Sequence, residues 1–299
     1  GHMSISRQNL TVIIVSFFSG KVIHDCISSI PEDIKIIIVD NSNDKFFKNE
    51  IENKYNNVRC ILSEKNIGMG AGNNYGLSEI DTDYGLVLNP DVVLRNDTID
   101  EMIFASKQID TFSIISPIMD DENYPNYKLR KWDNSINKNK EPFKVKSVDG
   151  FAMLLNLSRL NKFENFRNNE YFDENIFLYL ENDDLCKRIV ENGENIYVVP
   201  KSKIKHLGAK AVDEKYEYEI ELSRNWHWVW SKFYFNKKHY GYLNAFFKVC
   251  PIFISATFKV ILYFFINKRK KEIYLYRVFG FLNAATGKES FYRPKISNQ

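Results

Sequence analysis

The first half of the chain alternates short apolar runs with stretches that carry a helical pattern. The apolar runs predict buried strands, because continuous apolar residues fit the centre of a parallel sheet. These strands cover Leu10–Ser16, Ile34–Val39, Val58–Leu62, Leu86–Leu88 and Ile114–Ser116. Helices are predicted at about residues 21–29, in the polar stretch after residue 42, at 68–80 and at 98–108. Strands that alternate with helices in this way predict βαβ units and a mostly parallel sheet.

The second half has a less regular pattern. Residues 120–147 are polar and predict a long irregular loop. The elements predicted after it are a strand at Val148–Leu155, a helix at Glu181–Glu191 that Asn192-Gly193 closes, and short strands at Ile196–Val199 and Lys203–His206. After residue 226, aromatic residues interleave with lysine and arginine, and this shift marks the clearest boundary in the chain.

Polar residues follow three of the predicted strands. Right-handed crossovers place the carboxyl ends of parallel strands on one edge, so Ser16, Asp40 and Asp91 should line one crevice. Pro90 ends its strand because it cannot donate to a ladder, which leaves Asp91 on rigid backbone. A carboxylate there can bind a hard divalent cation and, through it, a diphosphate. The alternative is an ordinary turn, since turns favour Asn, Pro and Asp.

Two further polar motifs allow either a nucleotide-binding or a structural interpretation. Asp40-Asn41-Ser42 could hold a ribose hydroxyl or a base edge, or could cap the helix that follows. The stretch Asn66-Ile-Gly-Met-Gly-Ala-Gly-Asn-Asn-Tyr-Gly76 starts a helix with glycines, which cost about 1 kcal/mol each. A ligand close to the backbone, or tight packing of helix on sheet, would compensate. The spacing is neither a P-loop nor a clean dinucleotide fingerprint.

Acidic residues and one histidine complete the candidate chemistry. Glu181 and Asp184 are three residues apart at the start of a predicted helix, next to the apolar run Ile176–Leu180, as a general base would need. Acidic residues there also simply favour the helix dipole. His206 ends a strand, and a neutral imidazole would suit a manganese-like ion together with Asp91 and diphosphate oxygens.

Composition and charge exclude some classes of protein. The net charge of +3 gives no strong field for a polyanion. Four scattered cysteines without a CxxC pair argue against a zinc knuckle or a disulfide framework, and they fit a reducing cytosol.

Together these motifs resemble glycosyltransferase family 2, inverting enzymes of the GT-A fold, and most closely the rhamnosyltransferase-like branch that builds bacterial surface polysaccharides. The matching pieces are Val15-Ser16-Phe17, Val39–Ser42, the Asn66–Gly76 motif, Leu88–Asp91, Asp149-Gly150, Phe172-Asp173-Glu174, Tyr179–Arg188 and Pro200–His206. Order and spacing agree over about residues 10–237. The resemblance implies a Rossmann-like α/β fold with a mostly parallel central sheet, flanking helices and a C-terminal helical appendage.

The resemblance also implies domain bounds. A GT-A catalytic domain would cover residues 4–210, with a nucleotide-sugar half at about 4–118 and an acceptor half at about 119–210. A helical, aromatic and basic region would cover 211–299.

Roles for single residues follow from the same resemblance. The family's metal-binding Asp-x-Asp reads Asn89-Pro90-Asp91 here, so Asp91 would bind the metal and His206 would complete the metal or diphosphate site. The nucleotide sugar would contact Ser16, Phe17, Asp40, Asn41, Asn66, Gly70, Asn73, Asn74 and Asn89.

The catalytic base is where this chain departs from the family. The base usually lies in an acidic pair at the start of the late helix, but the pair reads Glu181-Asn182 here. Because an Asn side chain cannot accept a proton at neutral pH, we expect Glu181 to be the base, with Asp184 structural or supporting.

The expected reaction is direct displacement with inversion at the anomeric carbon. The implied cofactors are Mg²⁺ or Mn²⁺ and a dTDP- or UDP-sugar carrying rhamnose or another hexose. The implied acceptor is a polyprenyl-linked glycan or an oligosaccharide of O-antigen or capsule biosynthesis, with no nucleic-acid partner and a homo-oligomer left open. Two alternatives are a nucleotidyltransferase, and a catalytically weak nucleotide- or carbohydrate-binding protein, which Asn182 would explain.

The C-terminal region predicts contact with a membrane surface. Ala245–Ile266 is long and apolar, but Lys248 and Lys259 make a spanning helix costly. An interfacial amphipathic helix fits better, and the basic stretch Asn267–Lys271 would meet anionic head groups. We therefore expect a cytoplasmic protein, peripheral at the inner membrane. The alternative is a helix packed on the catalytic domain or on a second subunit.

Overall fold

The structure is a computed structural model that describes residues 4–130, 141–207 and 214–296. The chain divides into two compact units. The sheet unit comprises Gly1–Asp173 and Asn182–Val212, and the helical unit comprises Glu174–Glu181 and Asp213–Gln299. The domain boundary predicted between residues 210 and 211 lies outside the described residues.

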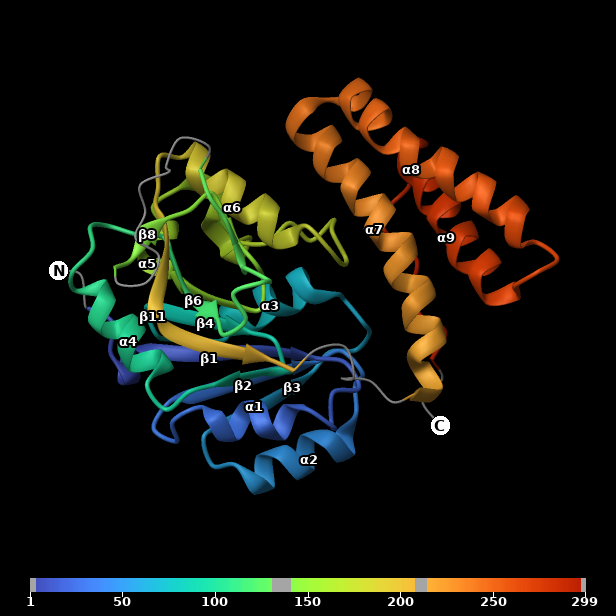
Figure 1. Ribbon diagram of the computed structural model, residues 1–299. Helices are drawn as coiled ribbons and strands as arrows, with labels where there is room; N and C mark the ends of the chain where they lie inside the picture. Colours follow the sequence, from blue (N-terminus) through green and yellow to red (C-terminus); the bar gives the residue numbers. More distant parts are fainter. Residues whose placement is uncertain (1–3, 131–140, 208–213, 297–299) are drawn as a thin grey trace. The chain divides into compact units, whose positions relative to one another are not determined.

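Parallel strands form the centre of the sheet unit (Figure 1). The strands of the main sheet are β1 Leu10–Ser16, β2 Lys35–Asp40, β3 Val58–Leu62, β4 Tyr84–Leu88, β5 Val92–Leu94, β6 Ile114–Met119, β8 Phe143–Lys144, β10 Ala152–Asn156 and β11 Ile196–His206. Their order is β3-β2-β1-β4-β10-β6-β11-β5, with β8 paired to β11. β10 runs antiparallel between β4 and β6, whereas β3, β2, β1 and β4 are parallel to one another. A separate pair consists of β7 Tyr127–Lys128 and β9 Ser147–Val148.

Helices cover both faces of this sheet. The helices of the unit are α1 Ile23–Ser29, α2 Lys45–Lys54, α3 Met69–Ser78, α4 Thr98–Ser106, α5 Leu157–Leu160 and α6 Glu181–Glu191, with short 3-10 turns η1 Arg7–Asn9 and η2 Glu164–Asn169. The side chains of β1 contribute to a hydrophobic core on each face of the sheet, because successive side chains of a strand point to opposite faces. Val12 and Ile14 pack with residues of α1, α2 and α4, whereas Ile13 packs with residues of α3, α5 and α6.

Two strands differ from the prediction. The strand predicted at Val148–Leu155 is interrupted at Asp149-Gly150-Phe151, so that β9 and β10 pair with different partners. The two short strands predicted near the end of the unit are one strand, β11, which shifts its register against β6 between Val199 and Lys203.

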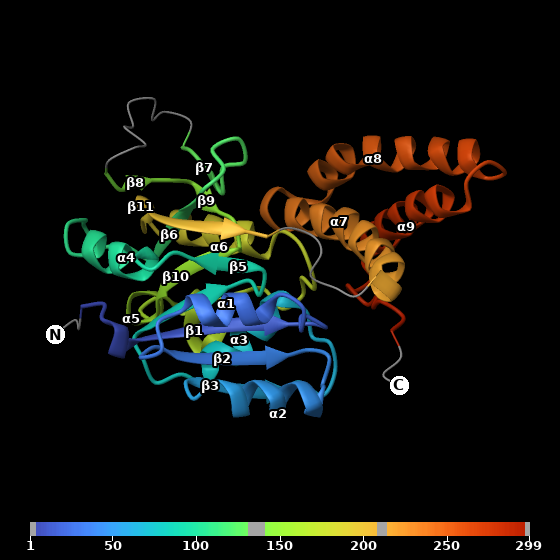
Figure 2. The same cartoon turned by 60° about the horizontal axis from the view of Figure 1, so that its bottom comes forward.

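Three long helices form most of the helical unit, and they pack side by side (Figure 2). They are α7 Glu217–Tyr240, α8 Tyr242–Tyr263 and α9 Lys268–Ala285, preceded by the turn η3 Glu214–Tyr216. Trp226, Phe233 and Phe281 are buried between them. α9 approaches α7 closely at Gly280, where a Cβ atom would collide with the Trp226 carbonyl oxygen.

Candidate active site

The carboxyl ends of β1 and β2 meet as the sequence predicts. Ser16 lies beside Asp40 in the parallel ladder, and its hydroxyl donates to Asp40 Oδ1 at 3.1 Å. The Asp40 carboxylate is buried and also accepts from the Ser42 hydroxyl, the Ser42 N–H and the Asp44 N–H. Asp40 therefore organises the loop after β2, and little of its hydrogen-bonding capacity remains for a ligand.

Two buried amide oxygens in this region accept no hydrogen bond from the described residues. They are Oδ1 of Asn41 and Oδ1 of Asn73, on side chains that are about 95% buried. The amide nitrogen of Asn41 donates to the Gly68 carbonyl at 3.0 Å, directly before α3. An unsatisfied buried acceptor costs about 1–3 kcal/mol. Donors of a bound ligand, such as ribose hydroxyls or the N–H of a base, would remove that cost.

Of the other residues predicted to contact a nucleotide sugar, some bond to or pack against the protein itself, and two lie partly exposed at strand ends. The side chain of Asn74 bonds to Phe172 twice, accepting from its N–H at 3.0 Å and donating to its carbonyl at 2.8 Å. Asn66 accepts from the Gly68 N–H, and Gly70 is buried in the first turn of α3. Phe17 and Asn89 are half-buried at the ends of β1 and β4, where each could face a ligand.

The glycines of α3 let the helix lie directly on the sheet. A Cβ atom at Gly72 would be 2.9 Å from Val15 side-chain atoms, and one at Gly76 would be 2.6 Å from Ile13 Cγ2. Packing of helix on sheet therefore accounts for Gly72 and Gly76. The structural interpretation of the motif thus holds for these two glycines.

Asp91 and His206 come together at the same edge of the sheet. β5 and β11 are antiparallel, with Val92 opposite His206, and the Leu207 N–H donates to the Asp91 carbonyl at 2.9 Å. This pairing places His206 Nε2 at 2.8 Å from Asp91 Oδ2, with both side chains partly exposed to solvent. The imidazole also stacks on the ring of Phe151, at 4.2 Å between centroids. Phe151 is a residue that the sequence did not single out.

The start of α6 contains both predicted acidic residues, and they differ in environment. Asp184 is fully buried and accepts from Arg188 Nε at 3.0 Å, and this arginine also bonds to the Tyr171 carbonyl. The structural role is therefore favoured for Asp184. Glu181 follows Tyr179 and Leu180, which have φ angles of 72° and 67° in the left-handed region. Such backbone is costly for residues other than glycine and often occurs next to functional groups.

Comparison with known protein families identifies the fold and the family. A family model described as Glycosyl transferase family 2 matches residues 11–163, just over half of the chain. The chain belongs to glycosyl transferase family 2. The predicted resemblance is thereby confirmed.

The mannosyltransferase PcManGT from Pyrobaculum calidifontis, solved with GDP-Man and Mn²⁺, superimposes with a TM-score of 0.55 at 11% identity, covering 92% of this chain and 86% of that one. The predicted GT-A fold is thus also confirmed.

Two curated relatives of this family 2 protein are similar in sequence. The low-salt glycan biosynthesis hexosyltransferase Agl10 of Haloferax volcanii is 27% identical over 63% of this chain and 64% of its own length. The rhamnosyltransferase WbbL of Escherichia coli is 28% identical over 56% of this chain and 71% of its own length. The chain therefore spans slightly less than two thirds of Agl10.

The family implies a divalent cation, and the residues at the strand ends fit one that arrives with a diphosphate. Asp91 offers a carboxylate oxygen and His206 an imidazole nitrogen at a shared position. Among the described residues, no group of three or more His, Cys, Asp or Glu side chains could hold a metal. Mg²⁺ is usually bound by one or two carboxylates plus substrate phosphates, so two protein ligands are consistent with such a site.

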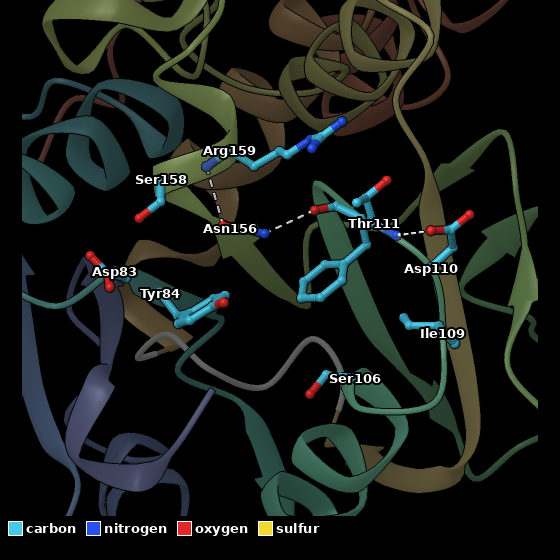
Figure 3. A pocket seen from close by; sticks show the side chains of 10 residues that line it. Asp83, Tyr84, Ser106, Ile109, Asp110, Thr111, Asn156, Ser158 and Arg159 are labelled. Carbon is cyan, nitrogen blue, oxygen red and sulfur yellow. Dashed lines mark hydrogen bonds between the residues drawn. The ribbon is translucent and has the colours of Figure 1, made fainter. Parts of the chain in front are cut away.

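A cavity of about 560 Å³ lies at the opposite edge of the sheet, where β4 begins and β10 ends (Figure 3). None of the residues predicted from the sequence to form the site lines this cavity. The Asn156 side chain accepts from the Arg159 N–H and donates to the Phe112 carbonyl. The Arg159 guanidinium is paired with Glu194. These polar groups therefore already have protein partners, and the cavity is separate from the candidate active site.

Proposed function

We propose that this protein is a metal-dependent inverting glycosyltransferase. It would transfer rhamnose or another hexose from a dTDP- or UDP-sugar to a lipid-linked or oligosaccharide acceptor in cell-surface polysaccharide biosynthesis. The observation that carries the proposal is the contact between Asp91 and His206 at the strand ends of a family 2 fold.

The nucleotide would bind along the ends of β1 and β2. The unsatisfied oxygens of Asn41 and Asn73 would accept hydrogen bonds from its ribose or base. Phe17 directly follows β1, and its ring would contact the base. Asp91 and His206 would hold the cation that accompanies the diphosphate. When bound, that cation would stabilise the negative charge that develops on the departing nucleoside diphosphate.

Transfer would be one displacement. A carboxylate removes the proton of the acceptor hydroxyl while the hydroxyl oxygen bonds to the anomeric carbon. The bond between that carbon and the phosphate oxygen breaks, and its electron pair leaves with the nucleoside diphosphate. A single displacement inverts the anomeric centre, so no sugar–enzyme bond forms. Glu181 is the sequence-based candidate for the base.

The helical unit would bind the membrane surface at which a lipid-linked acceptor is presented. Among the described residues, α8 alone is long and apolar enough to cross a membrane, and only 17% of its 18-residue apolar stretch is buried. Its outward side chains Leu243, Phe247, Phe258 and Ile261 are each about 70% exposed. The lysines within and after α8 favour binding in the interface over spanning the bilayer. The protein would then be cytoplasmic and peripheral at the inner membrane.

Release of nucleotide from a panel of sugar donors tests the proposal. The panel contains dTDP-rhamnose, UDP-hexoses and GDP-mannose, each with Mn²⁺, with Mg²⁺ and with EDTA, for wild type and Asp91→Ala. Wild type should release nucleoside diphosphate from one donor class only when a metal is present, and Asp91→Ala should be at least tenfold slower. Binding of nucleotide without release from any donor would instead favour a silent carbohydrate- or nucleotide-binding protein, which Asn182 would explain.

A further inference from the structure

One short segment links the start of α6 to the Asp91–His206 pair. At its beginning, the Val148 carbonyl accepts a hydrogen bond from Asn182 Nδ2 at 2.9 Å. Two residues later, a Cβ atom placed on Gly150 would lie 3.7 Å from the Asn182 Cβ atom. The backbone on both sides of Asp149 is therefore packed against the side chain of residue 182.

The other end of the segment is fixed at the strand edge. The ring of Phe151 stacks on the His206 imidazole, with an angle of 26° between the planes. The Phe151 carbonyl accepts from the Asn89 N–H at 2.9 Å, directly before the Asn89-Pro90-Asp91 corner. Asp149 thus lies in a segment held at both ends, between Asn182 and the residues that would bind the diphosphate. Its own N–H donates to the Asn126 carbonyl, which fixes the backbone at Asp149 itself.

Residues 182–184, which follow Glu181 in α6, are less suited to accept a proton. The Asn182 amide cannot accept one at neutral pH, and its nitrogen is bonded to Val148. Asp183 lies 3.6 Å from Lys128 Nζ, and Asp184 is fully buried against Arg188. Asp149 is half-buried, and the described structure gives it no ion pair. Its backbone packs against the side chain at position 182, where the family carries an acid and this chain carries Asn.

We propose that Asp149 is the general base, supplying the carboxylate that residue 182 lacks. This inference rests on the proposed function, and it replaces Glu181 in that role. The acceptor hydroxyl gives its proton to the Asp149 carboxylate as its oxygen bonds to the anomeric carbon. The electron pair of the breaking bond leaves with the nucleoside diphosphate, so atoms and charge balance without a further reactant.

The electrostatic surroundings agree with this role. Burial, and then the negative charge of Asp183, raise the pKa of Asp149, while Lys128 and His206 act in the opposite direction. A carboxylate with a raised pKa holds a proton better than one in water, and general bases work best when their pKa approaches the working pH.

Exchange of carboxylate and amide between positions 149 and 182 tests the inference. The variants are Asp149→Asn, Asn182→Asp, the double variant that combines them, and Glu181→Gln. Asp81→Asn is the matched control, because this side chain is 85% exposed in a loop before β4. Steady-state kcat and KM for the donor, and the Kd of the nucleoside diphosphate with Mn²⁺, are measured for each variant.

Asp149→Asn should lower kcat by about 10²- to 10⁴-fold, the usual contribution of a general base. KM for the donor and the Kd of the nucleotide should change by less than about threefold, and the stoichiometry of nucleotide binding should match wild type, which a misfolded variant would not satisfy. The kcat of the double variant should be at least tenfold higher than that of Asp149→Asn, because residue 182 is then an acid. Asp81→Asn should match wild type.

Other results would overturn the inference while leaving the proposed function intact. These are a kcat for Asp149→Asn within threefold of wild type, or a larger loss of kcat in Glu181→Gln than in Asp149→Asn. If Asp149→Asn does not fold, Asp149→Ala is assayed with added formate, which should restore nucleotide release; no restoration counts against the inference. Failure of the wild type to release nucleotide from any donor would instead remove the proposed function itself.

Discussion

Asp91 Oδ2 and His206 Nε2 lie 2.8 Å apart, although the two residues are far apart in the sequence. The antiparallel pairing of β5 with β11 produces this contact, since it sets Val92 opposite His206. The Asp91 carboxylate oxygen and the His206 imidazole nitrogen could coordinate one cation, and diphosphate oxygens would provide its other ligands.

Asp91→Asn should therefore weaken nucleotide binding only when a metal is present. The substitution keeps the shape of the side chain and removes its charge, so Kd for the nucleoside diphosphate in Mn²⁺ should rise at least about tenfold, or about 1.4 kcal/mol. Binding in EDTA should stay at the wild-type level. Isothermal titration calorimetry with and without Mn²⁺ measures both values, and an equal loss under both conditions would contradict a metal role for Asp91.

Asp184→Asn should reduce stability, because it leaves the largely buried Arg188 without its counter-charge. Breaking a buried ion pair costs about 3–5 kcal/mol. Urea unfolding measures the loss. Glu191→Gln is the control, since Glu191 pairs with Lys187 at the same helical spacing but is 57% exposed, and exposed pairs contribute about 0.3–0.5 kcal/mol. Equal midpoints for the two variants would show that the Asp184 pair is not structural.

The strands near the start of the chain could be predicted from the sequence because they are buried on both faces. Such strands read as continuous apolar runs, and the order of strands and helices then determines which ends share an edge. Ser16 and Asp40 are in contact for this reason. The pairing of His206 with Asp91 was a hypothesis from their ligand chemistry and from the family resemblance, because antiparallel pairing of β5 with β11 has no local signal in the sequence.

The contacts within the site depend on the directions of single side chains, which could not be predicted from the sequence. Asn73 and Asn74 are adjacent on α3 and so point in different directions. Asn74 is bonded to the Phe172 backbone, whereas Asn73 Oδ1 has no partner among the described residues. The interruption at Asp149-Gly150-Phe151 was missed because its flanking residues carry the apolar pattern of one strand. That interruption is what turns Phe151 onto His206.

Gly76→Ala should destabilise the sheet unit by about 1–3 kcal/mol, the usual cost of adding atoms to a tightly packed interface. Its Cβ would lie 2.6 Å from Ile13 Cγ2, so α3 would have to move away from β1. Gly20→Ala is the matched control, because no atom lies within 4 Å of a Cβ at that position. Thermal unfolding compares the two. If both variants melt at the same temperature, close packing does not explain Gly76.

The stability of the helical unit should fall in acid because of His227. Its ring is buried, its Nε2–H donates to the Tyr292 carbonyl, and its Nδ1 accepts from the Ser290 hydroxyl, which together fix the neutral tautomer. Burial lowers the pKa of His227 to about 3; the Tyr292 carbonyl acts in the opposite direction, and the positive charge of Arg293 lowers the pKa further. Below about pH 6.5 the unfolded chain therefore binds a proton at this position that the folded chain does not.

At pH 5.5 this difference should cost about 1.4 kcal/mol relative to pH 7.5, and the loss should grow as the pH falls towards 3. Urea unfolding, followed by the fluorescence of Trp226 and Trp230, measures the effect, since both are buried in the helical unit. His227→Gln should be less stable than wild type at pH 7.5 but less sensitive to pH. The same pH dependence in wild type and His227→Gln would mean that another group is responsible.

The apolar side of α8 and the turn after it should bind anionic membranes. Phe258 is 69% exposed and Phe265 is 94% exposed, and the basic stretch Lys268–Lys271 follows directly. Burial of one such ring contributes about 1.5–3 kcal/mol, so Phe258→Glu and Phe265→Glu should each lower the partition coefficient onto phosphatidylglycerol vesicles, measured by sedimentation, by about tenfold or more. Phe46→Glu is the matched control, because Phe46 is 87% exposed on α2 of the sheet unit. If all three variants sediment like wild type, α8 is not a membrane-binding surface. If the two α8 variants instead convert a wild-type oligomer to a monomer in size-exclusion chromatography, the apolar side binds a second copy of the chain.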